Sequence, residues 1–156
     1  MNLYYYATAL GRIGITERDG RITALSFEGE PVPEQADICE TAVLREAAGQ
    51  LKAYLAGERR CFSLPLEPVG TPFMQSVWRA LCDIPYGRTV SYRDIAAAVG
   101  NPQASRAVGR ANNRNPLPIF IPCHRVIGAN GALVGYGGGL ALKVMLLEIE
   151  KYKVNP

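Results

Sequence analysis

The sequence SYRDIAAAVGNPQASRAVGRANNRN, residues 91–115, decides the fold of the second half of this chain. Ser91, with Asp94 three positions later, forms a capping box, and the apolar run that follows predicts a short helix. The glycine after that run stops the helix. A second helix is expected to begin at Pro102 and to continue to about Asn112. Two short helices joined by a tight, glycine-containing turn are typical of a helix-turn-helix motif.

The second of these helices carries basic residues on one face. Arg106 and Arg110 are four residues apart, and Arg114 follows just beyond the helix. Small residues beside them would let the helix approach a surface closely: Ala107 and Ala111. The second half of the chain, from residue 70, also has a net charge of +6, against −3 for the first half. Such a face can serve solvation alone, but the clustering of arginines in a basic half favours DNA binding.

A candidate nucleophile follows the arginine helix. In Ile121-Pro122-Cys123-His124-Arg125-Val126 the only histidine of the chain stands beside a cysteine. A thiol attacks as its thiolate, and imidazole is well suited to take its proton, directly or through a water molecule. Prolines stiffen the preceding segment, residues 116–122. We therefore predict a reactive Cys123 with a depressed pKa, the alternative being a buried cysteine next to a surface histidine.

Six glycines between positions 128 and 139 surround Tyr136 and would let backbone groups approach a ligand closely. They do not fit the pattern GxxxxGK[ST], which excludes a nucleotide phosphate loop of that kind. A last helix is expected from Leu140 to Tyr152. Within it, Glu150 could orient His124 and complete a Cys-His-Glu relay, although Glu150 and Lys143 could equally be ordinary exposed helix charges.

The first half predicts a small sheet. Residues 3–9 and 21–27 have the composition of strands, Asp19-Gly20 is a hairpin signal, and residues 61–66 suggest a further short strand. Nothing in this half has the pattern of a catalytic site.

Two further helices are expected around the middle of the chain. One begins at Asp37, with Glu40 completing a capping box. The other is capped by Thr71, has proline at its first position and runs to about Ile84. The prolines and glycine of residues 65–72 mark a boundary between two domains, 1–69 and 70–156.

Composition indicates an intracellular globular protein. The chain has 156 residues, 48% hydrophobic and 20% charged, and shows neither an apolar run of membrane-spanning length nor a signal peptide. We expect a cytoplasmic location. The other cysteines, Cys39, Cys61 and Cys82, are widely spaced and are interpreted as small core residues, and a single histidine does not support a zinc site.

From about Thr71 to Glu150 the chain closely resembles the O6-alkylguanine-DNA alkyltransferases. The resemblance is carried by Asn115-Pro116, by the block 121–126, by Tyr136 and by Gly138-Gly139-Leu140-Ala141-x-Lys143. It implies an α/β fold, with a ribonuclease-H-like sheet plus helix in the first domain and a mostly helical second domain containing the helix-turn-helix. It implies direct DNA repair by a monomer without a cofactor. The alkyl group of O6-alkylguanine, and in some cases O4-alkylthymine, passes irreversibly to the protein's own cysteine.

The resemblance also implies residue roles. Cys123 is the acceptor, His124 its water-mediated base, and Glu150 the partner that polarises His124. Tyr92 assists base flipping and donates a proton to the guanine ring, Asn115 braces the turn before the active site, and Lys143 lies near the reactive centre. Arg106 fills the space of the flipped base as the helix enters the minor groove. The basic face of the helix, rather than the resemblance, makes Arg110 and Arg114 expected DNA contacts. The pocket is formed by Pro118, Val126, Tyr136, Gly137 and Gly138.

Three other functions fit parts of this pattern. A DNA-binding relative that only flags lesions would lack the acceptor cysteine. A cysteine hydrolase using Cys123 and His124 would turn over repeatedly and would not need the arginine helix. A transcription factor reading the major groove would not need the Pro-Cys-His-Arg block. Arg110 stands where many members of the family have a small residue, so the groove contact is expected to differ in detail. Asn112-Asn113 replaces a commoner Asn-Gly, and the turn is expected to be kept because asparagine tolerates left-handed geometry.

Overall fold

The structure is a computed structural model that describes residues 1–133 and 135–154, with side chains described through residue 151. The chain divides into two compact units, Met1–Val69 and Gly70–Pro156. Within the described residues, no helix combines the length and the apolar character that a membrane span requires.

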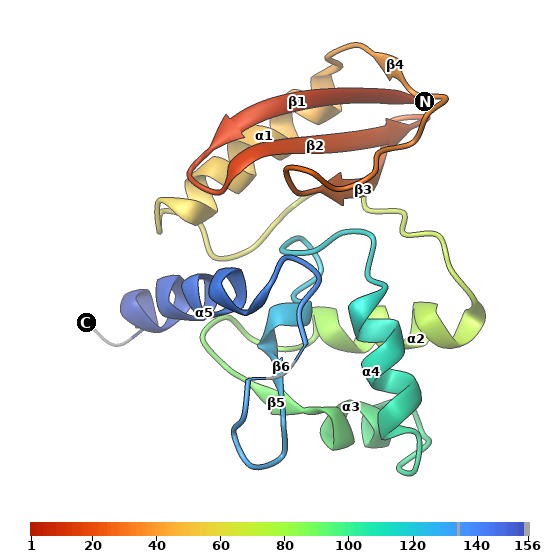
Figure 1. Cartoon of the computed structure of the whole chain (residues 1–156), viewed down its shortest axis with the longest axis vertical. Coiled ribbons are helices and arrows are strands. Elements are labelled where there is room, and N and C mark those ends of the chain that lie inside the picture. Colours follow the sequence, from red (N-terminus) through yellow and green to blue (C-terminus); the bar gives the residue numbers. More distant parts are fainter. Residues whose placement is uncertain (134, 155–156) are drawn as a thin grey trace. The chain divides into compact units, whose positions relative to one another are not determined.

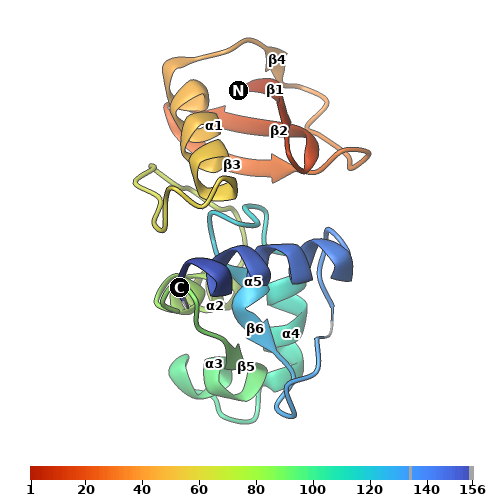
Figure 2. The same cartoon turned by 90° about the vertical axis from the view of Figure 1, so that its left-hand side faces the viewer.

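The first unit is a four-stranded sheet with one helix on its face (Figures 1 and 2). The strand order is β3-β2-β1-β4, with β1, β2 and β3 antiparallel and β4 parallel to β1. Helix α1 packs on β1, β2 and β3 through buried residues that include Leu44, Leu51 and Tyr54. The elements are β1 (Asn2–Thr8), β2 (Gly11–Arg18), β3 (Arg21–Ser26), β4 (Asp37–Ile38) and α1 (Ala42–Leu55).

The sequence prediction for this unit needs three corrections. Strand β2 was not predicted, and the Asp19-Gly20 turn joins it to β3; both turn residues have positive φ, 53° and 80°, as a type I′ hairpin requires. The helix does not begin at Asp37, because residues 37–38 pair with β1, and Thr41 caps α1 instead. The strand predicted over residues 61–66 is reduced to a single bridge between Ile22 and Leu66.

The second unit is mostly helical. Helices α2, α3 and α4 pack against one another, and α5 packs against the short 3-10 turn η1 (Figures 1 and 2). A two-stranded parallel pair, β5 with β6, leads into α3 on one side and follows η1 on the other. The elements are α2 (Pro72–Cys82), β5 (Val90–Ser91), α3 (Tyr92–Ala98), α4 (Ser105–Asn113), η1 (Cys123–Arg125), β6 (Val126–Ile127) and α5 (Leu140–Val154). Together the two units confirm the predicted α/β fold class.

Local sequence signals set most helix starts in this unit. The Thr71 side chain accepts from the Met74 amide, and Ser91 with Asp94 forms the reciprocal capping box. Helix α4 begins at Ser105 rather than at Pro102. The proline instead lies in a turn that the Ala104 amide closes on the Asn101 carbonyl, 3.0 Å away.

Trp78 is one of the largest buried side chains of this unit. It is 2% exposed, and its Nε1–H donates to the Ala111 carbonyl over 2.9 Å, which ties α2 to α4. A Cβ added to Gly70 would clash with the Trp78 ring, so glycine is needed there for close approach. The interpretation of Cys39, Cys61 and Cys82 as core residues is wrong, because all three are exposed.

Candidate active site

The segment that leads into the reactive turn is held by Asn115. Its Nδ2 donates to the Ile121 carbonyl over 2.9 Å, and its Oδ1 accepts from the Leu117 amide at 3.0 Å. The Ile121 amide in turn donates to the Leu117 carbonyl at 2.9 Å. Between them Ile119 has a φ of 75°, a left-handed conformation that is costly for a β-branched side chain. These hydrogen bonds close the loop that leads to Cys123, and they centre on Asn115, the residue at which a brace was predicted.

Cys123 begins η1 and is held through its backbone. Its amide donates to the Ile121 carbonyl over 2.7 Å, and its carbonyl accepts from Asn112 Nδ2 at 3.3 Å. Asn112 lies on α4 and is 2% exposed. The nucleophile and the arginine-bearing helix are therefore joined by a buried hydrogen bond.

Burial raises the pKa of the Cys123 thiol to about 11, contrary to the depressed pKa expected from the sequence. The side chain is 4% exposed, and removing a thiolate from water costs more than its neighbours return. The groups that favour the thiolate are the Asn115 side chain, the positive charge of Lys143, the turn's backbone and the Tyr136 hydroxyl. The resting protein therefore holds a thiol, which must lose its proton during the reaction.

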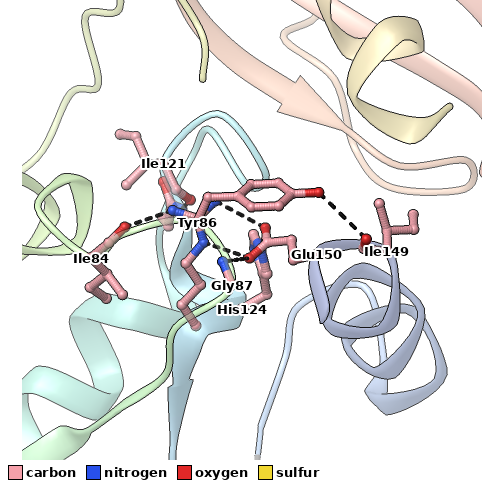
Figure 3. A network of polar contacts seen from close by, with 9 residues as sticks. Ile84, Tyr86, Gly87, Ile121, His124, Ile149 and Glu150 are labelled. Carbon is pink, nitrogen blue, oxygen red and sulfur yellow. Dashed lines mark hydrogen bonds and ion pairs between the residues drawn. The ribbon is translucent and has the colours of Figure 1, made fainter. Parts of the chain in front are cut away.

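His124 is fully buried and makes a short contact to a carboxylate. Its Nε2 lies 2.6 Å from Glu150 Oε2, on α5 (Figure 3). This contact places the ring proton on Nε2 and leaves Nδ1 as the basic atom. Burial lowers the pKa of His124, the Glu150 contact opposes that effect, and the charges of Arg125 and Lys143 add to the lowering. His124 is therefore neutral at pH 7 and able to accept a proton.

Arg125 completes this network, and the sequence assigned it no role. Its Nε donates to Glu150 Oε1 over 2.9 Å, its Nη2 to Oε2 over 3.0 Å, and its Nη1 to the Ile84 carbonyl over 2.7 Å. The Gly87 amide also donates to Glu150, and Tyr86 donates its hydroxyl to the Ile149 carbonyl (Figure 3). No sequence signal links Arg125 to residues 25 and 41 positions away.

Lys143 is not an exposed helix charge. It is buried, and its Nζ donates to the carbonyls of Val126, over 2.7 Å, and Gly135, over 3.4 Å. Burial lowers the pKa of its ammonium, and the nearby Cys123 opposes that shift. A cation fixed beside the thiol is suited to stabilise negative charge on sulfur.

The arginine-bearing face of α4 is open to solvent. Arg106, Arg110 and Arg114 are exposed and Ala107 is half-buried. Ala111 is 2% exposed, so its side chain is not part of this open face, contrary to the expectation from the sequence. Tyr92, the first residue of α3, is half-buried; its ring lies 3.9 Å from where a Cβ on Gly109 would stand. Burial, and then the nearby Cys123, raises the pKa of the Tyr92 hydroxyl, which keeps it protonated.

The residues predicted to form the pocket differ in exposure. Pro118 and Val126 are buried, Tyr136 and Gly138 are half-buried, and Gly137 is exposed. Val126 pairs with Val90 between β6 and β5, so it is also part of the core. Among the side chains that the structure describes, no group of three or more histidine, cysteine or acidic residues could hold a metal ion.

Comparison with known proteins identifies this arrangement. Residues 72–152 match the family described as 6-O-methylguanine DNA methyltransferase, DNA binding domain, and residues 2–68 match its ribonuclease-like domain. The chain belongs to the 6-O-methylguanine DNA methyltransferase family. It is 54% identical to the constitutive methylated-DNA–protein-cysteine methyltransferase of Bacillus subtilis over 94% of this chain and 95% of that protein. It is also 57% identical to the Mycobacterium leprae methylated-DNA–protein-cysteine methyltransferase over 74% and 70% of the two chains.

Solved structures agree with this assignment. The Mycobacterium tuberculosis OGT in complex with DNA is 42% identical, with a TM-score of 0.93 over 98% of this chain and 94% of that one. An O6-methylguanine DNA methyltransferase from Methanococcus jannaschii is 30% identical, with a TM-score of 0.67 over 94% and 92% of the two chains. Both likenesses span the two units.

Proposed function

We propose that this protein repairs O6-alkylguanine in double-stranded DNA by moving the alkyl group to Cys123, once per molecule. The observation that carries this is the buried Cys123, His124 and Glu150 set beside an exposed arginine face on α4, in a chain of this family. A hydrolase would need the same thiol but not the arginine face.

The geometry supports one order of proton and group transfers. His124 Nδ1 takes the Cys123 proton through a water molecule, and Glu150 stabilises the imidazolium that forms. Sulfur attacks the alkyl carbon, the carbon–O6 bond breaks, and its electron pair stays with the guanine. Tyr92 donates a proton to the ring, and the proton held by His124 then returns through water to the Tyr92 oxygen. Lys143 and Tyr136 stabilise charge near the sulfur while the thiol ionises. The product is a thioether, whose stability limits the protein to one turnover.

A base inside a duplex cannot reach a thiol that is 4% exposed. We propose that the damaged nucleotide is extruded, at a cost of a few kcal/mol, and that Arg106 fills its place. The exposed face of α4 enters the minor groove, with Arg110 and Arg114 contacting phosphates. Binding is then largely independent of sequence and weakens as salt rises.

Finer features belong to the same proposal. We also propose that the protein acts as a monomer and without a cofactor; the residues assigned to these reaction steps all lie in the unit Gly70–Pro156 of one chain. The proposal extends to O4-alkylthymine, which the family resemblance names beside O6-alkylguanine. The proposed site of action is the cytoplasm, and in a prokaryotic cell the nucleoid, where the DNA is.

The experiment uses a duplex with one O6-methylguanine and counts restored guanine against protein. We expect one guanine per protein molecule for the parent and none for Cys123→Ala, which should still bind DNA. Many products per molecule would indicate a hydrolase and overturn the proposal, as would binding without repair.

Arg106→Ala provides a second arm. It should slow repair of the duplex far more than reaction with free O6-methylguanine base, with exposed Arg88→Ala as the matched control. Equal slowing of both reactions would contradict the proposed filling of the base position.

A further inference from the structure

The Arg125 side chain makes two hydrogen bonds to one carboxylate, that of Glu150. Its guanidinium fork reaches both oxygens of Glu150, at 2.9 and 3.0 Å, and its remaining nitrogen reaches the Ile84 carbonyl at 2.7 Å. The guanidinium also lies 5.7 Å from the centre of the Tyr86 ring. Arg125 is 7% exposed and Glu150 1%, so this charge pair is shielded from solvent.

The same carboxylate contacts His124. Glu150 Oε2 lies 2.6 Å from His124 Nε2 and also accepts from Arg125 Nη2. A lone buried carboxylate would favour a positively charged imidazole, because the opposite charges would offset each other's loss of water. An imidazolium has no lone pair with which to take the Cys123 proton. A second cation on the carboxylate removes that bias.

We propose that Arg125 is a positioning residue that shares the charge of Glu150, so that His124 rests as a neutral base with its proton on Nε2. The bidentate fork also fixes which carboxylate oxygen faces the imidazole. This inference rests on the proposed function, because it explains how the base for the methyl transfer is kept ready.

The other groups around His124 are a second cation, which also lowers the pKa of His124, and uncharged backbone and hydroxyl groups. From α5, Lys143 adds a second positive charge, which also disfavours imidazolium. The segment before β5 contributes backbone groups, the Ile84 carbonyl and the Gly87 amide, and the Tyr86 hydroxyl is directed to the Ile149 carbonyl. Glu150 is the acid whose side chain contacts the imidazole.

The test is an NMR pH titration of the imidazole in the whole protein, which is unambiguous because the chain has one histidine. In the parent, His124 should titrate below 6.5, with the proton of the neutral ring on Nε2. Arg125→Gln should raise the pKa of His124 by roughly 1–3 units, the usual effect of removing a charge at this range. Arg125→Lys keeps the charge but loses the fork, and its His124 should still titrate below 6.5.

Methyl-transfer rates against pH supply a readout that a purely structural role would not move. The acid limb of the Arg125→Gln profile should shift to higher pH, and raising the pH should recover most of its rate. Arg125→Lys should show the limb of the parent with a lower plateau. An unshifted His124 titration in folded Arg125→Gln, or a loss of rate that is the same at every pH, would overturn the proposal.

If the near-ultraviolet circular dichroism spectrum of Arg125→Gln shows that this variant is not folded like the parent, Arg125→Lys provides the test of charge sharing. A His124 titration above that of the parent would then refute charge sharing, and one matching the parent, with a slower reaction, would support it. The titration needs no substrate. A parent protein that failed to accept a methyl group would therefore disprove the proposed function without affecting the result for Arg125.

Discussion

Replacing Glu150 with glutamine removes the charge on which four N–H donors from three residues converge. Glu150 accepts from His124 Nε2, from Arg125 Nε and Nη2, and from the Gly87 amide, at 2.6 to 3.2 Å. A glutamine could keep the bonds at one oxygen, but its NH₂ would meet donors at the other, and the Arg125 charge would be left buried. Breaking a buried pair in this way costs about 3–5 kcal/mol.

The measurement is denaturant unfolding followed by the fluorescence of Trp78, the only tryptophan, which lies in the same unit as Glu150. Glu148→Gln, an exposed neighbour on α5, is the matched control and should change the unfolding free energy by less than about 0.5 kcal/mol. A loss of under about 1 kcal/mol for Glu150→Gln would refute the buried network as drawn.

Three further outcomes follow from packing and burial. Gly70→Ala should destabilise the second unit by about 1–3 kcal/mol, because its Cβ would clash with Trp78. Gly49→Ala, whose Cβ would stand in open space on α1, should stabilise the first unit by roughly 0.5–1 kcal/mol. Equal shifts of the thermal unfolding midpoint for the two variants would contradict this. A thiol reagent at pH 8 should modify the exposed Cys39 and Cys61 rapidly and Cys123 slowly, because burial raises the pKa of Cys123 to about 11. Burial also raises the pKa of Cys82, so Cys82 should react more slowly than Cys39 and Cys61. A Cys123 that reacts as fast as Cys39 and Cys61 would refute that protonation state. Because folding lowers the pKa of His124, the unfolded chain binds that proton more readily than the folded protein does. The free energy of unfolding should therefore fall as the pH drops below 6.5, by at most about 1.4 kcal/mol per pH unit. His124→Gln should lack this part of the slope between pH 7.5 and 5.5, and an unchanged slope in that variant would be the contrary result.

Features set by neighbouring residues could be predicted from the sequence. The Thr71 and Ser91 caps depend on side chains and amides three residues apart, and both were identified correctly. The same reasoning failed at Asp37, where a plausible cap was overridden by pairing with β1, an interaction between distant segments. Strand β2 was missed because glycines interrupt its apolar pattern.

The active site was predicted only in part. Cys123, His124 and Glu150 were predicted as a relay, and the structure brings His124 and Glu150 into contact. The depressed pKa of Cys123 was wrong, because it was inferred from an adjacent residue while burial by distant segments decides the outcome. Arg125 was missed because its partners lie 25 and 41 positions away.

The central claim is that Cys123, and no other residue, accepts the alkyl group. Reaction with a duplex carrying isotope-labelled O6-methylguanine, followed by trypsin digestion and mass spectrometry, tests it on the peptide of residues 115–125. The proposed chemistry predicts one labelled methyl group on Cys123 of that peptide, at one per protein molecule. Label on Cys39, Cys61 or Cys82, or repaired DNA with no label on any cysteine, would contradict it.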